Sequence, residues 1–404
     1  MEIKLPENVE YILNKLEMGG FRADIVGGPV RDFLLGKIPD DYDITTSASP
    51  EETKKIFSTD RTVDTGIKHG TVSVILDGIS YEVTTYRIDG EYRDSRHPES
   101  VTFTKNIEED LRRRDFTMNA IAYSPERGIT DPYGGQSDVS LGVIRAVGEP
   151  EVRFTEDALR ILRGARFSAT LGFEVEEETR LAMLKTKELL LNVSVERIYT
   201  ELKKMISGDY SYEALSTFSD VILTVVPELK DLNLPKRELY EKADYASRLI
   251  SVFYLNSKEA AYCFDNAMKR LHTDSHIREL GAKVIPLIEN TDTASPRGLT
   301  YIMRDIGEEF ARSLLNVKIL LGISSEKDKK QLLELIDSGA PYRISDLNIN
   351  GSDLISIGAK GKQIGETLDR LLAQVIDGKL KNEKTALVSE ANIIISSLKN
   401  ANLI

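Results

Sequence analysis

Apolar residues recur along this chain with two different periods, and the change from one to the other falls near residue 150. Before that point, short runs such as 23–26, 71–76 and 79–86 are apolar or alternate with polar residues, as β-strands do. After it, apolar positions return every three or four residues, which is the period of an amphipathic helix. The stretches with this helical period include 194–206, 239–253, 259–271, 277–288, 310–321, 327–336 and 365–376.

The pattern predicts an α+β protein in which a small mixed sheet with helices is followed by an all-α part. In the first part we expect helices over 5–17 and 49–57, a hairpin that turns at Asp77-Gly78, and a last strand over 141–147. Residues 88–103 are rich in charge and have no period. They predict a mobile loop, either a functional lid or plain surface disorder.

The stretch from residue 26 to residue 36 has the composition of an anion site. A strand leads into Gly27-Gly28, and Pro29 favours the start of a short helix that Gly36 ends. Backbone N–H groups at a helix start suit a phosphate chain when no Cβ obstructs them, and Arg31 adds a positive fork.

Carboxylates follow this turn directly. Residues two apart in a strand point to the same face, so we expect Asp41 and Asp43 to project together while Tyr42 and Ile44 face the core. Two carboxylates beside a phosphate site favour Mg²⁺, which acts on the attacking and leaving oxygens of a phosphoryl transfer. An Asp-rich turn without function is the alternative, and the preceding glycine pair with Asp32 argues against it.

Glu82 lies on the return strand of the predicted hairpin. A third carboxylate from a neighbouring strand is what an Asp-x-Asp metal site commonly needs, since it can also accept the proton of an attacking hydroxyl. Periodicity alone favours this role and a solvent-facing position equally.

Three successive arginines at 112–114 cannot share one face of a helix, so at most one or two of them are expected to enter a site while the rest lie in solvent. We expect Arg114, together with Asp115 and Asn119, to lie near a nucleotide. The arginine suits phosphate, and the acid and the amide suit ribose hydroxyls.

The predicted helix 155–167 carries a row of charged residues at every third position, namely Asp157, Arg160, Arg163 and Arg166. Cytosine and adenine both present an amine donor beside a ring-nitrogen acceptor, so Asp157 accepting from the amine and Arg160 donating to the nitrogen fits either base. Uracil and guanine invert that pair and would be rejected. Arg163 and Arg166 would orient Asp157 or reach phosphate, and the alternative for the whole row is a set of surface contacts.

The composition is that of a globular protein, with 41% hydrophobic and 29% charged residues in a chain of 404. Cys263 is the only cysteine, which fits a reducing cytoplasm. No stretch reaches the apolar length of a membrane span. The formal net charge of −12 argues against a general nucleic-acid coat, while a local basic patch can still hold one shaped RNA.

Three motifs together resemble the bacterial class II CCA-adding tRNA nucleotidyltransferases. They are Gly27-Gly28 with Arg31-Asp32 and Asp41-x-Asp43, then Arg113-Arg114-Asp115-Phe116-Thr117-x-Asn119-Ala120, then Glu156-Asp157-x-x-Arg160 with Arg163 and Arg166. They occur in the family's order and are highly specific as a set. The part from Gly351 through Glu383 is similar to the shorter, histidine-poor branch, which lacks a histidine-aspartate phosphohydrolase domain.

The resemblance implies a catalytic head over 1–148, a helical neck with the base-reading helix over 149–208, a body over 209–335 and a tRNA-binding tail over 336–404. It implies template-independent addition of C, C and A to the acceptor end of tRNA from CTP and ATP, with neither DNA nor a membrane as partner. It implies Mg²⁺ at Asp41 and Asp43, Glu82 as the third carboxylate, and nucleotide contacts from Gly28, Arg31, Arg114, Asp157, Arg160, Arg163 and Arg166. Gly27, Asp32, Asp115 and Asn119 complete the expected nucleotide-binding set.

Several alternatives stay open. A relative that adds only A or only CC is one, and the charged loop 88–103 favours the complete activity because members that add only CC lack that loop. A bacterial poly(A) polymerase shares the head motifs but resembles proteins with a basic C-terminal extension, which we do not expect here. A non-catalytic RNA-binding protein would have no need of Asp41, Asp43 and Glu82.

Overall fold

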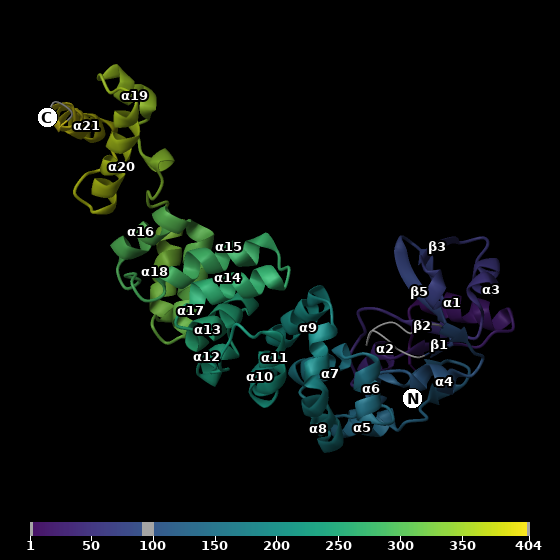
Figure 1. Ribbon diagram of the computed structural model, residues 1–404. Helices are drawn as coiled ribbons and strands as arrows, with labels where there is room; N and C mark the ends of the chain where they lie inside the picture. The colour runs from purple at the N-terminus through teal and green to yellow at the C-terminus, as the bar shows by residue number, and fades with distance from the viewer. Residues whose placement is uncertain (1–2, 91–100, 402–404) are drawn as a thin grey trace. The chain divides into compact units, whose positions relative to one another are not determined.

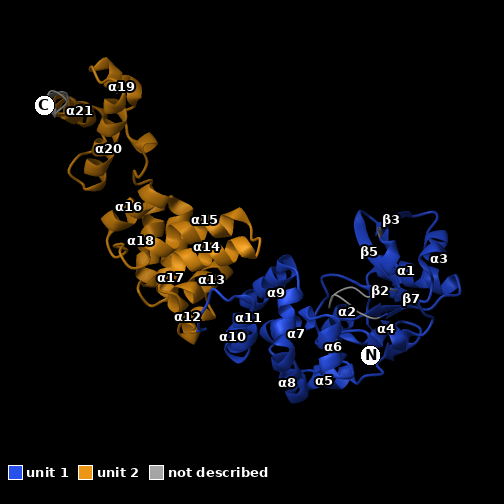
Figure 2. Cartoon of the chain, viewed as in Figure 1, with its two compact units in different colours: residues 1–232 blue, residues 233–404 orange. Residues whose placement is uncertain are grey.

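The computed structural model describes residues 3–90 and 101–401. It divides into two compact units, residues 1–232 and 233–404 (Figure 2). All candidate site residues lie in the first unit. The finer domain boundaries after residues 148, 208 and 335 stay predictions.

The first unit contains a seven-stranded sheet with the order β3-β4-β5-β2-β1-β8-β9. β2 pairs with β5 in parallel, and the other neighbouring strands in this sheet pair antiparallel, so the predicted mixed sheet is confirmed. The strands are β1 (Ala23–Val26), β2 (Ile44–Thr46), β3 (Arg61–Gly66), β4 (Thr71–Leu76), β5 (Ile79–Thr85), β8 (Ala122–Ser124) and β9 (Gly128–Thr130).

Local sequence explains the hairpin and the helices beside the sheet. β4 and β5 meet at Asp77 and Gly78, whose φ angles of 51° and 79° are those of a type I′ turn. α3 (Pro50–Ile56) begins with a capping box formed by Ser49 and Glu52. α1 (Glu7–Met18) contacts β1 and α3, and it buries an apolar stripe of Val9, Ile12, Leu13 and Leu16.

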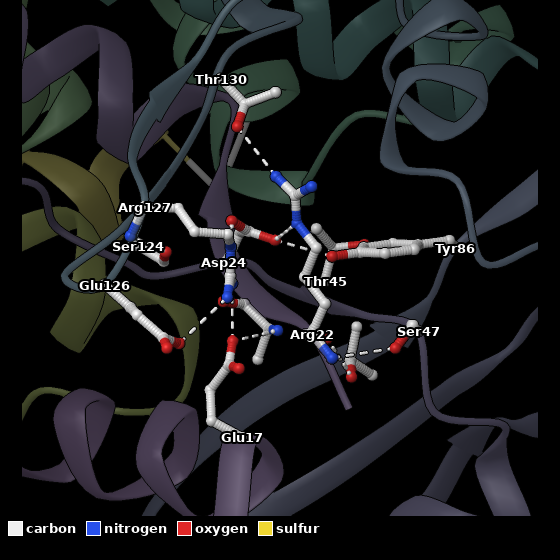
Figure 3. Close-up of polar contacts among 12 residues, drawn as sticks. Glu17, Arg22, Asp24, Thr45, Ser47, Tyr86, Ser124, Glu126, Arg127 and Thr130 are labelled. Atoms are coloured by element: carbon white, nitrogen blue, oxygen red, sulfur yellow. Dashed lines mark hydrogen bonds and ion pairs between the residues drawn. The ribbon is translucent and has the colours of Figure 1, made fainter. Parts of the chain in front are cut away.

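A buried carboxylate, Asp24 of β1, links the sheet to its surroundings (Figure 3). Tyr86 Oη donates to Asp24 Oδ2 at 2.6 Å, and Arg22 Nε donates to the same oxygen at 3.1 Å. Arg127 Nη2 lies 3.5 Å from Asp24 Oδ1 and 2.6 Å from Glu17 Oε1 of α1. Burial and the Asp24 carboxylate raise the pKa of Tyr86 far above its usual range, so its hydroxyl remains a donor.

We expect Tyr86→Phe to lower the free energy of unfolding of the first unit by about 1.5–3 kcal/mol, the range for a hydrogen bond to a charged group. The ring still fills its place, but Asp24 loses the 2.6 Å hydrogen bond. Urea unfolding followed by circular dichroism measures the change. Tyr262→Phe is the control, because that side chain is 65% exposed; equal midpoints for the two variants would contradict the role given to the bond.

The expected loop 88–103 is ordered at both ends. β6 (Arg87–Asp89) and β7 (Val101–Phe103) pair antiparallel in a small separate sheet. The predicted loop was therefore too long, because residues 88–89 and 101–103 belong to strands. Its central part, residues 91–100, lies outside the described residues.

The predicted strand 141–147 is wrong. α5 (Gly135–Leu141) occupies its first residue, and Gly142 ends that helix with a φ of 69°. The strand of this stretch is β10 (Val143–Ile144), which pairs in parallel with β11 (Glu174–Val175) in a separate sheet, and Ala146 forms an isolated antiparallel bridge with Phe116. The apolar run was real, but a helix end interrupts it.

Helices follow from residue 150 to the end of the first unit (Figure 1). α7 (Leu159–Leu171) packs against α9 (Val195–Ser207) and α10 (Ser211–Thr217). α6 (Pro150–Glu156) packs against α8 (Glu177–Thr186), and α11 (Ser219–Val225) follows.

In the second unit, the described residues form helices and connecting segments without a strand. The predicted helices there are confirmed except two. The helix 239–253 is broken between α12 (Arg237–Tyr240) and α13 (Tyr245–Asn256), where Asp244 caps α13. The helix 277–288 is α-helical only to Val284 and continues as a 3₁₀ turn over Ile285–Leu287. None of the helices in the described parts of the chain is long and apolar enough to cross a membrane. The remaining α-helices of the second unit are α14 (Ala260–Arg270), α15 (Ser275–Val284), α16 (Pro296–Ile306), α17 (Glu308–Leu320), α18 (Glu326–Asp337), α19 (Gly351–Ser356), α20 (Lys362–Ile376) and α21 (Lys384–Ala401).

Candidate active site

Gly27 ends β1 and turns the chain into α2 (Gly28–Leu34), as the sequence predicts. Its φ of 80° and ψ of −126° are accessible essentially to glycine alone. Arg114 Nη1 lies 3.0 Å from the place that a Cβ on residue 27 would occupy. The missing side chain therefore permits both the turn and the close approach of the arginine.

We expect Gly27→Ala to weaken nucleotide binding by about tenfold or more, because backbone strain of about 1–3 kcal/mol adds to displacement of Arg114. Calorimetric titration with CTP measures the affinity. Gly20→Ala is a matched control, since Gly20 has a φ of 82° but open space where a Cβ would be. If both variants bound CTP like the wild type, the close approach of Arg114 would have no part in binding.

Asp41 and Asp43 lie just before β2, so the predicted strand at these positions is wrong. β2 begins at Ile44, although Val26 N–H still donates to Asp43 O at 3.0 Å. The chain leaves β1 at Gly27, so residues 41 and 42 have no paired strand residue beyond that point. The side chains of Asp41 and Asp43 are exposed, and Ile44 is buried as expected.

Glu82, in the middle of β5, lies beside Asp43. The parallel register pairs Ile44 with Val83, so the residues before them, Asp43 and Glu82, are neighbours. Desolvation by the surrounding protein raises the pKa of the Asp43 carboxyl. The positive charge of Arg114 opposes this effect, while the negative charges of Asp41 and Glu82 add to it. Repulsion among these acids is the condition that a bound cation relieves.

The carboxylates do not form a closed metal cage on their own. Within residues 3–90 and 101–401, no three His, Cys, Asp or Glu side chains converge closely enough to hold a metal ion. Mg²⁺ is commonly held by one or two carboxylates together with substrate phosphates. Asp41 and Asp43 therefore fit an ion that binds together with a triphosphate.

Arg114 is placed between the glycine turn and the carboxylates. The fully buried Asp110 of α4 (Ile107–Arg112) lies 2.8 Å from Arg113 Nη2 and 3.4 Å from Arg114 Nη2. Burial alone would raise the pKa of Asp110, but the two arginines hold it below its usual range. Arg114 Nε is buried and meets no hydrogen-bond partner among the described residues.

Polar side chains of the three motifs form one chain of contacts from α2 to α7. Arg31 donates to Asp32 and to Asn119 Oδ1, each at 2.8 Å, and Asn119 Nδ2 donates to Asp115 Oδ1 at 3.1 Å. Arg163 Nη2 lies 2.6 Å from Asp115 Oδ2. Burial alone would raise the pKa of Asp115, but Arg163 and Asn119 hold it well below its usual range. The structure thus brings together residues that are far apart in the sequence.

The prediction of one continuous helix over 155–167 is wrong. α6 ends at Glu156, α7 begins at Leu159, and Asp157 between them has an extended backbone with φ −136° and ψ 102°. Asp157 Oδ1 accepts from Leu159 N–H at 3.1 Å and so caps the start of α7. Asp157 Oδ2 accepts from Arg197 Nη2 of α9 at 2.9 Å. An aspartate stabilises a helix start better than a helix interior, which explains the break.

The arginines of the predicted row are bound to protein groups. Arg160 donates to Glu156 at 2.8 Å, to Arg153 O at 3.0 Å and to Arg113 O at 2.7 Å. Arg166 Nε donates to Glu201 Oε2 at 2.9 Å. The guanidinium carbons of Arg31, Arg163 and Arg166 lie 5.4, 5.3 and 3.5 Å from the centre of the Phe167 ring.

Sequence reasoning missed Asp110, Arg197 and Glu201. For Glu201 a signal existed, since it is a charged residue within the apolar face of a predicted helix, beside Leu202, and it is only 5% exposed. Asp110 follows two other acidic residues and carried no comparable signal.

Family models match three parts of the chain. "Poly A polymerase head domain" matches residues 23–145 and "tRNA nucleotidyltransferase domain 2" matches 253–391. "RNA and SrmB- binding site of polymerase A" matches 172–231.

Curated relatives are similar over almost the whole chain. The CCA-adding enzyme of Leuconostoc mesenteroides is 36% identical over 392 residues, covering 94% of each chain. That of Geobacillus thermodenitrificans is 37% identical over 385 residues, covering 92% of this chain and 93% of the relative.

Solved structures show the same similarity. The CCA-adding enzyme of Bacillus stearothermophilus in complex with CTP has a TM-score of 0.81 and 30% identity, covering 99% of this chain and 100% of that one. The Thermotoga maritima CCA-adding enzyme complexed with tRNA has a TM-score of 0.67 and 23% identity, covering 98% of this chain and 96% of that one, and shares the fold.

Proposed function

The chain belongs to the family of CCA-adding enzymes, and we propose that it adds C, C and A to the 3′ end of tRNA from CTP and ATP without a nucleic-acid template. The observation that carries the proposal is the convergence of the Gly27 turn, Arg114 and the carboxylate of Asp43. A phosphate-binding turn beside acidic residues suits nucleotidyl transfer, because both the triphosphate and a cation can be held there.

Enzymes of this family generally use a divalent metal, and we propose that Asp41 and Asp43 hold Mg²⁺ here. When bound, the ion supplies charge neutralisation at the transferring phosphoryl group and activates the attacking 3′ hydroxyl. Glu82 beside Asp43 accepts the proton of that hydroxyl. Arg114 and Arg31 hold the triphosphate.

Selection of the base falls to Asp157 and Arg160. Asp157 accepts from the exocyclic amine shared by cytosine and adenine, and Arg160 donates to the adjacent ring nitrogen. In the structure Arg160 is bound to Glu156 and to two backbone carbonyls. These bonds use three of the five N–H donors of Arg160, so two donors remain for the base.

The complete reaction is favoured over narrower ones, because the curated relatives named above are CCA-adding enzymes. An A-adding or CC-adding specialist and a poly(A) polymerase are the enzymatic alternatives. A non-catalytic RNA-binding role would not explain the grouped carboxylates of Asp41, Asp43 and Glu82. We place the activity in the cytoplasm, where uncharged tRNA ends are repaired and where a lone cysteine stays reduced.

The test uses one tRNA that lacks all three terminal nucleotides and one that lacks only the final A. Each is incubated with CTP alone, ATP alone, both, or all four triphosphates, and the products are sized and sequenced. We expect CC from CTP alone on the first tRNA, a single A on the second, and CCA with both nucleotides. Runs of A on any RNA would indicate a poly(A) polymerase, and no product from the first tRNA would indicate an A-adding specialist.

The metal is tested in the same assay. We expect EDTA to stop addition and Mg²⁺ to restore it. Unchanged addition in excess EDTA would refute the metal assignment while leaving the product assignment intact.

A further inference from the structure

The aromatic ring of Phe167, near the middle of α7, lies among three arginines of the proposed nucleotide site. The guanidinium carbon of Arg166 lies 3.5 Å from the ring centre, and those of Arg163 and Arg31 lie 5.3 and 5.4 Å from it. All three distances are within the range of about 6 Å for a cation–π contact. Arg31 belongs to α2, so positive groups of the phosphate-binding turn and of α7 meet at this one ring.

Three guanidiniums at one place repel one another. Burial lowers the pKa of Arg166; Glu201 opposes this effect, while the positive charge of Arg163 adds to it. The side chains of Arg31 and Arg166 are only 11% and 12% exposed, so water screens the repulsion poorly. Groups that attract these cations must therefore hold them together before a nucleotide binds.

Polar partners meet part of this requirement, but they occupy N–H donors. Asp32 and Asn119 accept from three of the five N–H groups of Arg31. An aromatic ring attracts a guanidinium through its face and occupies no N–H group. Among the described residues Arg166 donates through Nε alone, to Glu201 Oε2 at 2.9 Å. Its other four N–H groups therefore stay available while the ring holds the guanidinium.

We propose that Phe167 is a positioning residue for nucleotide binding, whose ring gathers the three guanidiniums and leaves N–H donors free for the substrate. This inference rests on the proposed role of these arginines and adds the group that holds them together. The ribose triphosphate is common to CTP and ATP, so the ring serves both nucleotides equally. Selection of the base stays with Asp157 and Arg160.

The ring itself is fixed in place. Phe167 is 4% exposed, and it meets the fully buried Phe116 edge to face, with ring centres 5.9 Å apart and planes at 87°. Gly164, one turn before Phe167, makes room for this pair, because a Cβ there would lie 3.2 Å from Phe116 Cζ. A ring held in this way can in turn hold the arginines around it.

An ordinary apolar core position is the competing explanation. A core position requires the volume and the apolar character of the ring, whereas a cation–π contact requires the negative charge on its face. Replacing ring hydrogens by fluorine withdraws that charge and nearly preserves the shape and the apolar character. The two explanations therefore predict different results for a fluorinated ring.

The experiment places mono-, di- and pentafluorinated phenylalanine at position 167 of the full chain and measures KM and kcat. CTP is tested on a tRNA that lacks its 3′ end, and ATP on one that lacks only the final A. We expect KM for both nucleotides to rise with each added fluorine, by about tenfold in all, the effect of losing one partly desolvated cation–π contact. The kcat values and the preference for CTP over UTP should change little.

The same series at Phe264 is the matched control. Phe264 is 1% exposed and meets Phe253 edge to face at 5.2 Å in the second unit, so fluorine disturbs a similar aromatic pair outside the nucleotide site. It should leave both KM values unchanged. Phe167→Leu should raise them at least as much as the pentafluorinated ring does; if that variant fails to fold, the fluorinated series decides, because it keeps the shape of the ring.

Two results would overturn the inference. One is a KM that stays constant across the fluorinated series at position 167. The other is a loss of the preference for CTP over UTP without any change in KM, because it would place the ring in base selection.

Arg31→Gln and Arg166→Gln distinguish this inference from the proposed function. If both variants raise KM for CTP while the fluorinated series does not, the arginines bind the nucleotide and only the role of the ring is refuted. If neither variant changes KM for CTP while CCA is still completed, the assignment of these arginines to the nucleotide is wrong, and the inference is refuted with it.

Discussion

Asp43→Ala and Asp41→Ala are each expected to reduce the addition of every nucleotide by about 1,000-fold or more, because a metal that stabilises the transferring phosphoryl group supplies several kcal/mol. Binding of tRNA should change little. The two carboxylates act on the triphosphate and the attacking hydroxyl, and they have no attraction for an RNA backbone. Single-turnover addition of C and of A measures the first effect, and filter binding of tRNA measures the second.

The adjacent Asp40→Ala is the matched control, since Asp40 is exposed and precedes the Asp41-x-Asp43 pair. It should retain nearly full activity. Asp43→Ala is also expected to lose any response to added Mg²⁺. Full activity of Asp41→Ala or Asp43→Ala at the usual Mg²⁺ concentration would be incompatible with the metal assignment.

The periodic parts of the fold were predictable because their causes are local. The stripe of α1, the capping box at Ser49 and the turn at Asp77-Gly78 each need only a few neighbouring residues. The error at residue 41 occurred where a distant partner decides. Asp41 is not part of β2 because the neighbouring strand β1 ends at Gly27. The residues around position 41 give no indication of where β1 ends.

The helix break at Asp157 shows a different limit. The charged row keeps its three-residue spacing from Asp157 in the break to the arginines of α7, so periodicity favoured one helix. An aspartate that accepts from the N–H of Leu159 and from Arg197 gains more as a cap than as a helix residue. The residue type of Asp157 already favoured a helix start, but its partner Arg197 on α9 lies 40 residues away in the sequence. Arg197 could therefore be recognised only in the structure.

Motif order predicted which residues gather better than it predicted how they bind. Asp115 and Asn119 were expected beside the ribose, and the structure places them in a chain from Arg31 to Arg163. Such a chain holds side chains in fixed orientations before a ligand arrives. Their proposed contact with the nucleotide remains a prediction.

Asp157→Ala is expected to reduce the preference for CTP and ATP over UTP and GTP by about 10- to 100-fold, because a bidentate base contact discriminates by about 1–3 kcal/mol. The affinity for triphosphate should fall much less, since phosphate contacts position the nucleotide without reading its base. Competition between CTP and UTP in one reaction, with sequenced products, measures the preference, and calorimetry measures the affinity.

Asp157→Asn sharpens the same prediction. Its amide can still cap α7 through Leu159 N–H, but its NH₂ group donates where the carboxylate accepts. Uracil presents a carbonyl oxygen where cytosine presents an amine, so this variant should incorporate UMP more readily than Asp157→Ala does. If Asp157→Asn instead kept the wild-type preference for CTP, the carboxylate would not be reading the amine, and the base would have to be selected by other groups.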